Sequence, residues 1–246
     1  MTQAQVTIRT QDGECPAYVF TPAAGGRHPA VIFFMDGLGI RPTLFEMGQR
    51  LADHGYVVLV PDLFYRAGSY EPLDPKAVFA SGDARSALAH LFSSTDNRRA
   101  GEDTEAFLGY LGTRDDVVGT KVGTTGYCMG GAISLTAAGT YPDRVAAAAS
   151  FHGGNLATDS DLSPHLLAPR IAARVYVAGA DNDSSYPPEM ADRLEQALTD
   201  AGVDHRCEIY DEALHGWTMA DFPVYNQAAA ERHWEELLAL FAATLT

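Results

Sequence analysis

The chain has 246 residues, of which 46% are hydrophobic and 20% are charged, a composition that excludes a disordered protein. Its 32 acidic and 17 basic residues give a formal charge of −15, which repels nucleic acid and anionic membrane surfaces. We therefore expect neither as a partner. The length and even composition predict one domain over residues 1–246, as a monomer or a homodimer.

Targeting signals and metal-binding cysteine patterns are not apparent in the sequence. The first ten residues, MTQAQVTIRT, lack a basic region followed by an apolar stretch, and no segment reaches the roughly 18 apolar residues of a membrane span. We expect a cytoplasmic protein. The three cysteines, Cys15, Cys128 and Cys207, show no C-x-x-C spacing, which argues against a disulfide framework and against a zinc site.

The predicted elements alternate between strand and helix along almost the whole chain. Two short strands at 6–10 and 17–21 flank a turn and predict a hairpin. Continuous apolar runs then predict buried parallel strands, and helical spacing predicts the segments between them. The strands are expected at 30–35, 57–60, 121–126, 145–151, 173–178 and 205–210, and the helices at 44–54, 83–93, 104–111, 131–140, 189–201 and 228–245, with a polar connection at 98–103. This order predicts an α/β fold with a doubly wound, mostly parallel sheet and helices on both faces.

The segment GTTGYCMGG at 123–131 contains G-x-C-x-G between a strand and a helix, which is the pattern of a nucleophile elbow. Such a turn aims Cys128 at the N-terminal end of the following helix, where the dipole favours a thiolate and the N–H of Met129 can donate to an oxyanion. A buried structural cysteine is the alternative. The strand-turn-helix context favours the nucleophile.

A base and an orienting acid are expected further along the chain. His215 follows the last predicted strand and would lie at the carboxyl edge of the sheet, where catalytic groups gather. His152 ends the strand after the elbow and is its one serious rival, with pocket lining as the more probable role. The loop after 173–178 offers Asp181 and Asp183, and spacing does not choose between them.

These segments resemble the dienelactone hydrolase family, also called carboxymethylenebutenolidases, over nearly the whole chain. The matching pieces are MDG at 35–37, HGY at 54–56, VPDL at 60–63, GYCMGG at 126–131 and HG at 215–216. The resemblance implies an α/β-hydrolase fold and a Cys-His-Asp triad. It favours Asp183 over Asp181, because the family's catalytic aspartate stands four residues before a proline, here Pro187.

The resemblance also implies roles for the residues beside the nucleophile and for the substrate contacts. Asp36 stands where the family has a glutamate that controls the thiol, and Gly37 would supply the second oxyanion N–H. Met219 replaces the family's carboxylate-binding arginine, so the chain offers no clamp at that position. We expect Trp217 and Met219, with Phe222 and Tyr225, to form a partly apolar wall of the pocket. Arg41, Arg66 and Arg85 are the nearest basic candidates for a clamp.

The expected activity is hydrolysis of a small ester or lactone through a thioester acyl-enzyme, with no metal or organic cofactor. A thioesterase or broad carboxylesterase on the same triad is the leading alternative. A non-catalytic small-molecule binding protein and a redox-sensing thiol are two further hypotheses, and the absence of a second cysteine near Cys128 in sequence disfavours the last.

Overall fold

An eight-stranded sheet runs through the centre of the computed structural model, which describes residues 2–80 and 84–245. Its spatial order is β1-β2-β4-β3-β5-β6-β7-β8. The β1–β2 and β2–β4 pairs are antiparallel, whereas all other neighbours are parallel. The strands are β1 (Thr2–Arg9), β2 (Glu14–Thr21), β3 (Ala30–Phe34), β4 (Val57–Pro61), β5 (Val122–Tyr127), β6 (Val145–Phe151), β7 (Arg174–Ala180) and β8 (His205–Tyr210). The predicted mostly parallel sheet is therefore confirmed.

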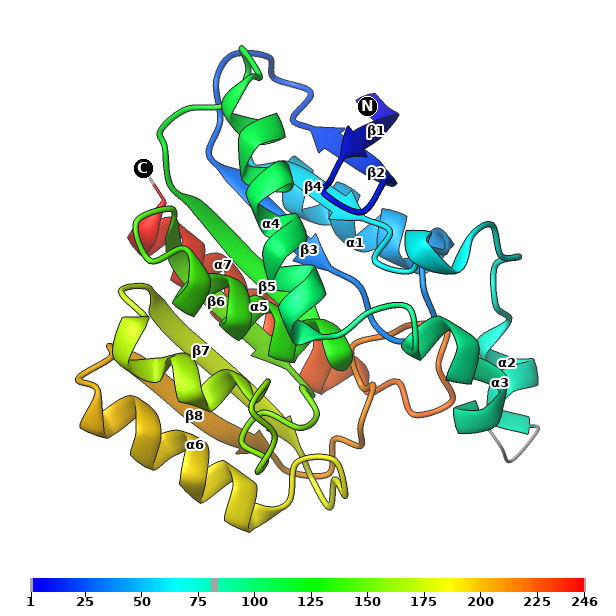
Figure 1. Cartoon of the computed structure of the whole chain (residues 1–246), viewed down its shortest axis with the longest axis vertical. Helices are drawn as coiled ribbons and strands as arrows, with labels where there is room; N and C mark the ends of the chain where they lie inside the picture. The colour runs from blue at the N-terminus through cyan, green and yellow to red at the C-terminus, as the bar shows by residue number, and fades with distance from the viewer. Residues whose placement is uncertain (1, 81–83, 246) are drawn as a thin grey trace.

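Helices cover both faces of this sheet, as predicted. Figure 1 shows α4, α5 and α6 in front of the sheet and α1 and α7 behind it. Every residue of β3 and β4 is buried, which explains their unbroken apolar sequences. The helices are α1 (Pro42–Asp53), α2 (Pro75–Ala80), α3 (Ala84–Phe92), α4 (Asn97–Gly112), α5 (Met129–Thr140), α6 (Pro188–Asp200) and α7 (Gln227–Thr244), and two short 3₁₀ turns cover Tyr65–Ala67 and Pro164–Arg170.

Helix α4 corrects one prediction. The polar connection expected at 98–103 is helical, and α4 begins before it. Asp96 caps this helix, because its side chain accepts a hydrogen bond from the N–H of Arg99 at 2.8 Å. Ala100, Thr104 and Phe107 then face the core at helical spacing. Arg98, Arg99 and Glu102 lie outside this buried face, and the buried Asp103 pairs with Arg66, so these charges do not interrupt the helix.

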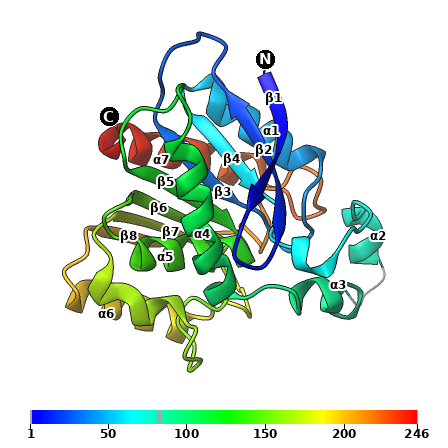
Figure 2. The same cartoon turned by 45° about the horizontal axis from the view of Figure 1, so that its top comes forward.

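The short helices α2 and α3 stand to one side of the sheet, in both views (Figures 1 and 2). Helix α2 was not predicted, and the predicted helix at 83–93 begins at Asp83, which lies outside the described residues. Among the described residues, no helix combines the length and the hydropathy that crossing a membrane needs.

Candidate active site

The elbow at the end of β5 holds Cys128 in a strained conformation. Its φ of 55° and ψ of −118° are rare for a side chain with a β-carbon, and it directly precedes the first residue of α5. A β-carbon on Gly126 would lie 1.8 Å from the carbonyl oxygen of Gly130, and one on Gly130 would lie 2.3 Å from that of Phe34. Only glycine fits at both positions, so this local sequence forces the half-buried thiol outward at the helix start.

His215 lies in the loop that follows β8 and reaches both other members of the predicted triad. Its Nδ1 atom is 2.6 Å from Oδ2 of Asp183, and its side chain also hydrogen-bonds to Cys128. Burial opposes a charged imidazole, but the hydrogen bonds to Asp183 and Cys128 outweigh it and raise the pKa of His215 to about 10. His215 therefore holds a proton at neutral pH.

Asp183 lies in the loop after β7, and its carboxylate is almost fully buried. One oxygen accepts the His215 hydrogen bond, and the other accepts from the N–H and the hydroxyl of Ser185 at 2.8 and 2.6 Å. Burial would raise the pKa of Asp183, but these hydrogen bonds together hold it below the ordinary value. Sequence reasoning missed Ser185, which lies two residues after the acid, as in an Asx turn.

Asp181 has a different set of contacts. Its carboxylate accepts from the side-chain amide of Asn182 at 2.9 Å and from the backbone N–H of Glu212 at 3.3 Å. Its own N–H donates to the carbonyl of Ala213. Asp181 thus joins the loop after β7 to the loop that carries His215, and none of these hydrogen bonds involves the imidazole.

His152 is buried beside His215, with 5.2 Å between the ring centroids. Its Nε2 lies 2.7 Å from the hydroxyl of Thr218, and its Nδ1 has no hydrogen-bond partner among the described residues. Burial, followed by the neighbouring charges of His215 and His233, lowers the pKa of His152 well below the ordinary histidine value. A neutral imidazole without a carboxylate partner is a weaker candidate for the base than His215.

Two of the four residues expected to form an apolar pocket wall beside His215 belong to the core instead. Trp217 and Met219 have no exposed surface, so as core residues they present nothing to a ligand. Trp217 instead stacks on Tyr210, with 5.2 Å between the ring centroids. Of the four expected residues, Phe222 is half-buried and Tyr225 is exposed.

Asp36 and Arg41 form a buried ion pair in the loop that follows β3. Two guanidinium nitrogens of Arg41 donate to the two oxygens of Asp36 at 2.8 and 2.7 Å, and the N–H of Leu38 donates to the same carboxylate at 2.7 Å. Arg41 also donates to both oxygens of Asp221, at 2.7 and 3.3 Å, and to the carbonyl of Gly39. These contacts account for all five N–H groups of the guanidinium.

The other candidate clamp residues differ in what the structure describes. Arg66 is bidentate to Asp103 at 2.8 Å and also contacts Asp12 at 2.7 Å. The side chain of Arg85 lies outside the described residues. Neither Arg41 nor Arg66 is therefore available for a substrate carboxylate unless an existing ion pair breaks.

Two phenylalanines of the short helices α2 and α3 border the site, and sequence reasoning missed both. Phe92 approaches Gly37 so closely that a β-carbon there would lie 2.6 Å from its ring. Phe79 packs against Phe222 of the His215 loop, with 5.0 Å between the ring centroids. The sequence signal that could have found them is the presence of two phenylalanines in one short stretch before the elbow. Both are exposed in the structure.

The sheet order and the strand-turn-helix elbow define the chain as an α/β-hydrolase. The family model of the dienelactone hydrolase family matches residues 15–245, and the chain belongs to that family. Its class, a hydrolase of the dienelactone hydrolase type, is thereby confirmed.

Individual relatives agree with this assignment. A protein of Synechocystis sp. is 29% identical over 245 residues, which cover 98% of this chain and 96% of its own. The carboxymethylenebutenolidase of Rhodococcus opacus is 27% identical over 253 residues, with 100% and 94% covered. The crystal structure of a dienelactone hydrolase-like promiscuous phosphotriesterase from metagenomic libraries has a TM-score of 0.79 at 23% identity, covering 100% of this chain and 99% of its own. At that identity the structural match supports the fold alone.

Proposed function

We propose that this chain hydrolyses a small ester or lactone through a Cys128–His215–Asp183 triad and a thioester acyl-enzyme. The observation that carries the proposal is the continuous hydrogen-bonded series from Cys128 through His215 to the buried carboxylate of Asp183. An isolated structural cysteine has no need of such a series. Three groups with these roles in one row are what nucleophilic acyl transfer requires.

The reaction would proceed in two halves. With the proton on His215, the sulfur of Cys128 attacks the carbonyl carbon while the N–H groups of Gly37 and Met129 hold the oxyanion. The imidazolium then gives its proton to the leaving alkoxide, which leaves a thioester on Cys128. Water, deprotonated by His215, cleaves the thioester and releases the acid.

Asp36 is expected to play a smaller part in controlling the thiol than its position implies. Both of its oxygens are bound to Arg41 at 2.8 and 2.7 Å, so the carboxylate is neutralised within its own loop. We propose that it shapes the loop that carries Gly37. The occupied guanidiniums of Arg41 and Arg66 also favour a neutral substrate over one that bears a carboxylate.

A thioesterase or broad carboxylesterase would use the same triad, and substrate choice separates these functions. A lactone, an aryl ester and an acyl thioester, all neutral, should be compared by kcat/KM. The lactone or the ester should be the best substrate, and a clear preference for the thioester would favour the alternative. The single domain over residues 1–246, the cytoplasmic location and the monomeric or homodimeric state stay as predictions.

The covalent mechanism itself is tested with Cys128→Ala. Removal of the attacking atom should abolish hydrolysis in a protein whose circular dichroism spectrum is unchanged. Cys15→Ala is the matched control, because Cys15 is a buried thiol of β2 whose sulfur donates to the backbone carbonyls of Pro16 and Asp62. Near-normal turnover by a folded Cys128→Ala protein would exclude both the covalent mechanism and the triad.

A further inference from the structure

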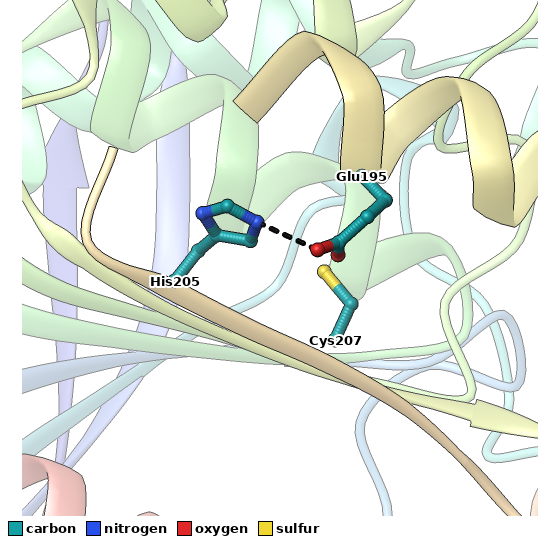
Figure 3. Close-up of side chains that lie close together, drawn as sticks. All are labelled: Glu195, His205 and Cys207. Atoms are coloured by element: carbon teal, nitrogen blue, oxygen red, sulfur yellow. Dashed lines mark hydrogen bonds and ion pairs between the residues drawn. The ribbon is translucent and has the colours of Figure 1, made fainter. Parts of the chain in front are cut away.

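A second group of chemically versatile side chains lies on the face of β8 that α6 covers. His205 and Cys207 are two residues apart on this strand and point to the same side, and Glu195 of α6 faces them (Figure 3). One ligand-capable atom from each of the three residues lies within 4.8 Å of the other two. The mechanism above uses none of them.

The hydrogen bonds of His205 indicate which of its ring nitrogens is free to bind a metal. Its Nδ1 lies 2.7 Å from the carbonyl oxygen of Val203, which only accepts, so Nδ1 carries a proton. Its Nε2 lies 3.1 Å from a carboxylate oxygen of Glu195, which is also an acceptor when ionised. With the proton on Nδ1, the lone pair of Nε2 is directed at this carboxylate, and a metal ion between the two atoms would bind both. The arrangement at Nδ1 is the one by which proteins orient metal-binding histidines.

The geometry of the three side chains is close to that of a tetrahedral zinc site. Around zinc, sulfur, nitrogen and oxygen donors stand about 3.3 to 3.7 Å from one another, given metal–ligand distances of roughly 2.0 to 2.3 Å. The imidazole and carboxylate atoms are already 3.1 Å apart, and all three donors lie within 4.8 Å. Half of the Glu195 side chain is exposed, so its carboxylate is free of packing that would hold it away from a metal.

The donor set selects the metal. A thiolate and an imidazole suit zinc, whereas magnesium and calcium prefer sites made only of oxygen. A metal would bind the sulfur of Cys207 as a thiolate, so binding would release the thiol proton.

The surroundings of the cluster add acidic side chains and a hydroxyl group, that of Tyr186. A cavity of about 170 Å³ beside the cluster is lined by Tyr186, Asp192, Glu195, Cys207, Glu208 and other residues. The hydroxyl of Tyr186 is buried and has no hydrogen-bond partner among the described residues. Tyr186 lines the same cavity as Glu195 and Cys207, so a species bound in that cavity could accept the hydrogen bond of its hydroxyl.

We propose that Glu195, His205 and Cys207 form a zinc-binding site, with a water molecule from the adjoining cavity as the fourth ligand. On binding, Cys207 gives up its thiol proton, and any second proton on His205 leaves as well, so the charge of the metal replaces theirs. The hydroxyl of Tyr186 then donates to the zinc-bound water or to a carboxylate of the cluster. The metal ties α6 to the edge strand β8. The sequence argument against zinc considered only paired cysteines, whereas this site combines one cysteine with donors from two elements.

The experiment uses the full chain with Cys128→Ser, so that the thiol beside His215 does not bind the metal. Zinc is titrated in competition with a chromophoric chelator, and cobalt(II) serves as a spectroscopic substitute. We expect one zinc per chain, a thiolate-to-cobalt charge-transfer band, and a thermal midpoint that rises with zinc and falls again with a chelator. Adding Cys207→Ser or His205→Gln should remove the band or shift it, and should weaken zinc binding by tenfold or more.

Two variants serve as controls in the same background. Cys15→Ser removes a buried thiol elsewhere, and Glu189→Gln changes an exposed carboxylate on the same helix, so both should leave zinc affinity unchanged. Substoichiometric zinc, or an affinity that Cys207→Ser and His205→Gln both leave intact, would overturn the proposal. If Cys207→Ser does not fold, a cobalt spectrum of the parent protein without thiolate character overturns it alone. None of these readouts depends on hydrolytic activity, so the outcome is independent of the proposed triad.

Discussion

Two loops meet beside Cys128, and they are held in different ways. The elbow after β5 is fixed by backbone sterics, because β-carbons at Gly126 and Gly130 would collide with carbonyl oxygens at 1.8 and 2.3 Å. The loop after β3 is fixed by charge, through Arg41 bound to Asp36 and to Asp221. The elbow therefore depends on glycines that approach one another and the backbone of β3, whereas the second loop depends on a side-chain contact between residues 180 positions apart. The first orients Cys128, the proposed nucleophile, and the second holds the loop that carries Gly37.

The largest expected effect is that of replacing His215, the proposed base, which contacts Cys128 of the elbow. His215→Gln should lower kcat/KM by roughly 10⁴- to 10⁶-fold, because the imidazole that carries the thiol proton is removed. His152→Gln is the matched control, since His152 lies 5.2 Å from His215 but bonds to Thr218. It should cost far less. The opposite ranking in steady-state kinetics would move the base to His152.

A smaller loss is expected from the acid. Asp183→Asn should lower kcat/KM by roughly 10²- to 10⁴-fold, because the imidazole loses the carboxylate that orients it and stabilises its charge. Asp181→Asn, whose carboxylate bonds to Asn182 and to the N–H of Glu212, should change it little. Equal, small effects in both variants would place the acid elsewhere.

The pH profiles of the wild-type enzyme and of Asp183→Asn test the contact between Asp183 and His215. The imidazolium must protonate the leaving group, so kcat/KM should fall as pH rises through about 10, the raised pKa of His215. Asp183→Asn removes a group that raises this pKa, so the alkaline limb should move to lower pH. Because the folded pKa is above the unfolded one, His215 should stabilise the fold below about pH 6.5 and lose that contribution as pH rises towards 10. An unchanged limb in Asp183→Asn would contradict the assigned contact.

Loss of the ion pair in the loop after β3 should lower the free energy of unfolding. Arg41→Met leaves the buried Asp36 without its partner, which should cost about 3 to 5 kcal/mol in the free energy of unfolding. Arg50→Met is the control, because the Arg50–Glu231 pair is exposed and should contribute less than about 1 kcal/mol. Urea denaturation measures both, and equal losses would mean that the buried network does not hold the loop.

The smallest expected effect is in substrate charge. Since the guanidiniums of Arg41 and Arg66 are occupied, a neutral ester should be hydrolysed at least as fast as its carboxylate-bearing analogue, compared by kcat/KM. A preference of roughly 10- to 150-fold for the carboxylate, lost in Arg85→Met, would instead reveal an arginine clamp.

The same contrast explains what the sequence could predict. The elbow, the order of strands and helices along the chain and the candidacy of His215 follow from local patterns, since a glycine turn or a buried strand is determined by adjacent residues. The choice of Asp183 over Asp181 came from the family resemblance. Helix α4 shows the limit of this reasoning, because the charges at 98–103 concealed the burial of Ala100 and Thr104.

Contacts between distant segments were beyond any local pattern. Nothing near Arg41 indicates that Asp221 will bind it, and the cluster of Glu195 with Cys207 forms only when α6 packs on β8. Trp217 and Met219 resembled a pocket wall because aromatic and apolar residues suit both a pocket and a core. Both are completely buried, and Trp217 stacks on Tyr210 at the end of β8, a contact that depends on how the loop after β8 folds back.

The proposed mechanism requires Cys128 to carry the acyl group during turnover. The direct measurement is intact-protein mass spectrometry with peptide mapping, after wild-type enzyme and a neutral aryl ester are mixed and quenched in acid within a turnover. We predict one acyl group per chain, attached to the peptide that contains Cys128, which disappears once the substrate is exhausted and never forms in Cys128→Ala. Steady turnover with no acyl group at Cys128, or with an acyl group on another residue, would contradict this account.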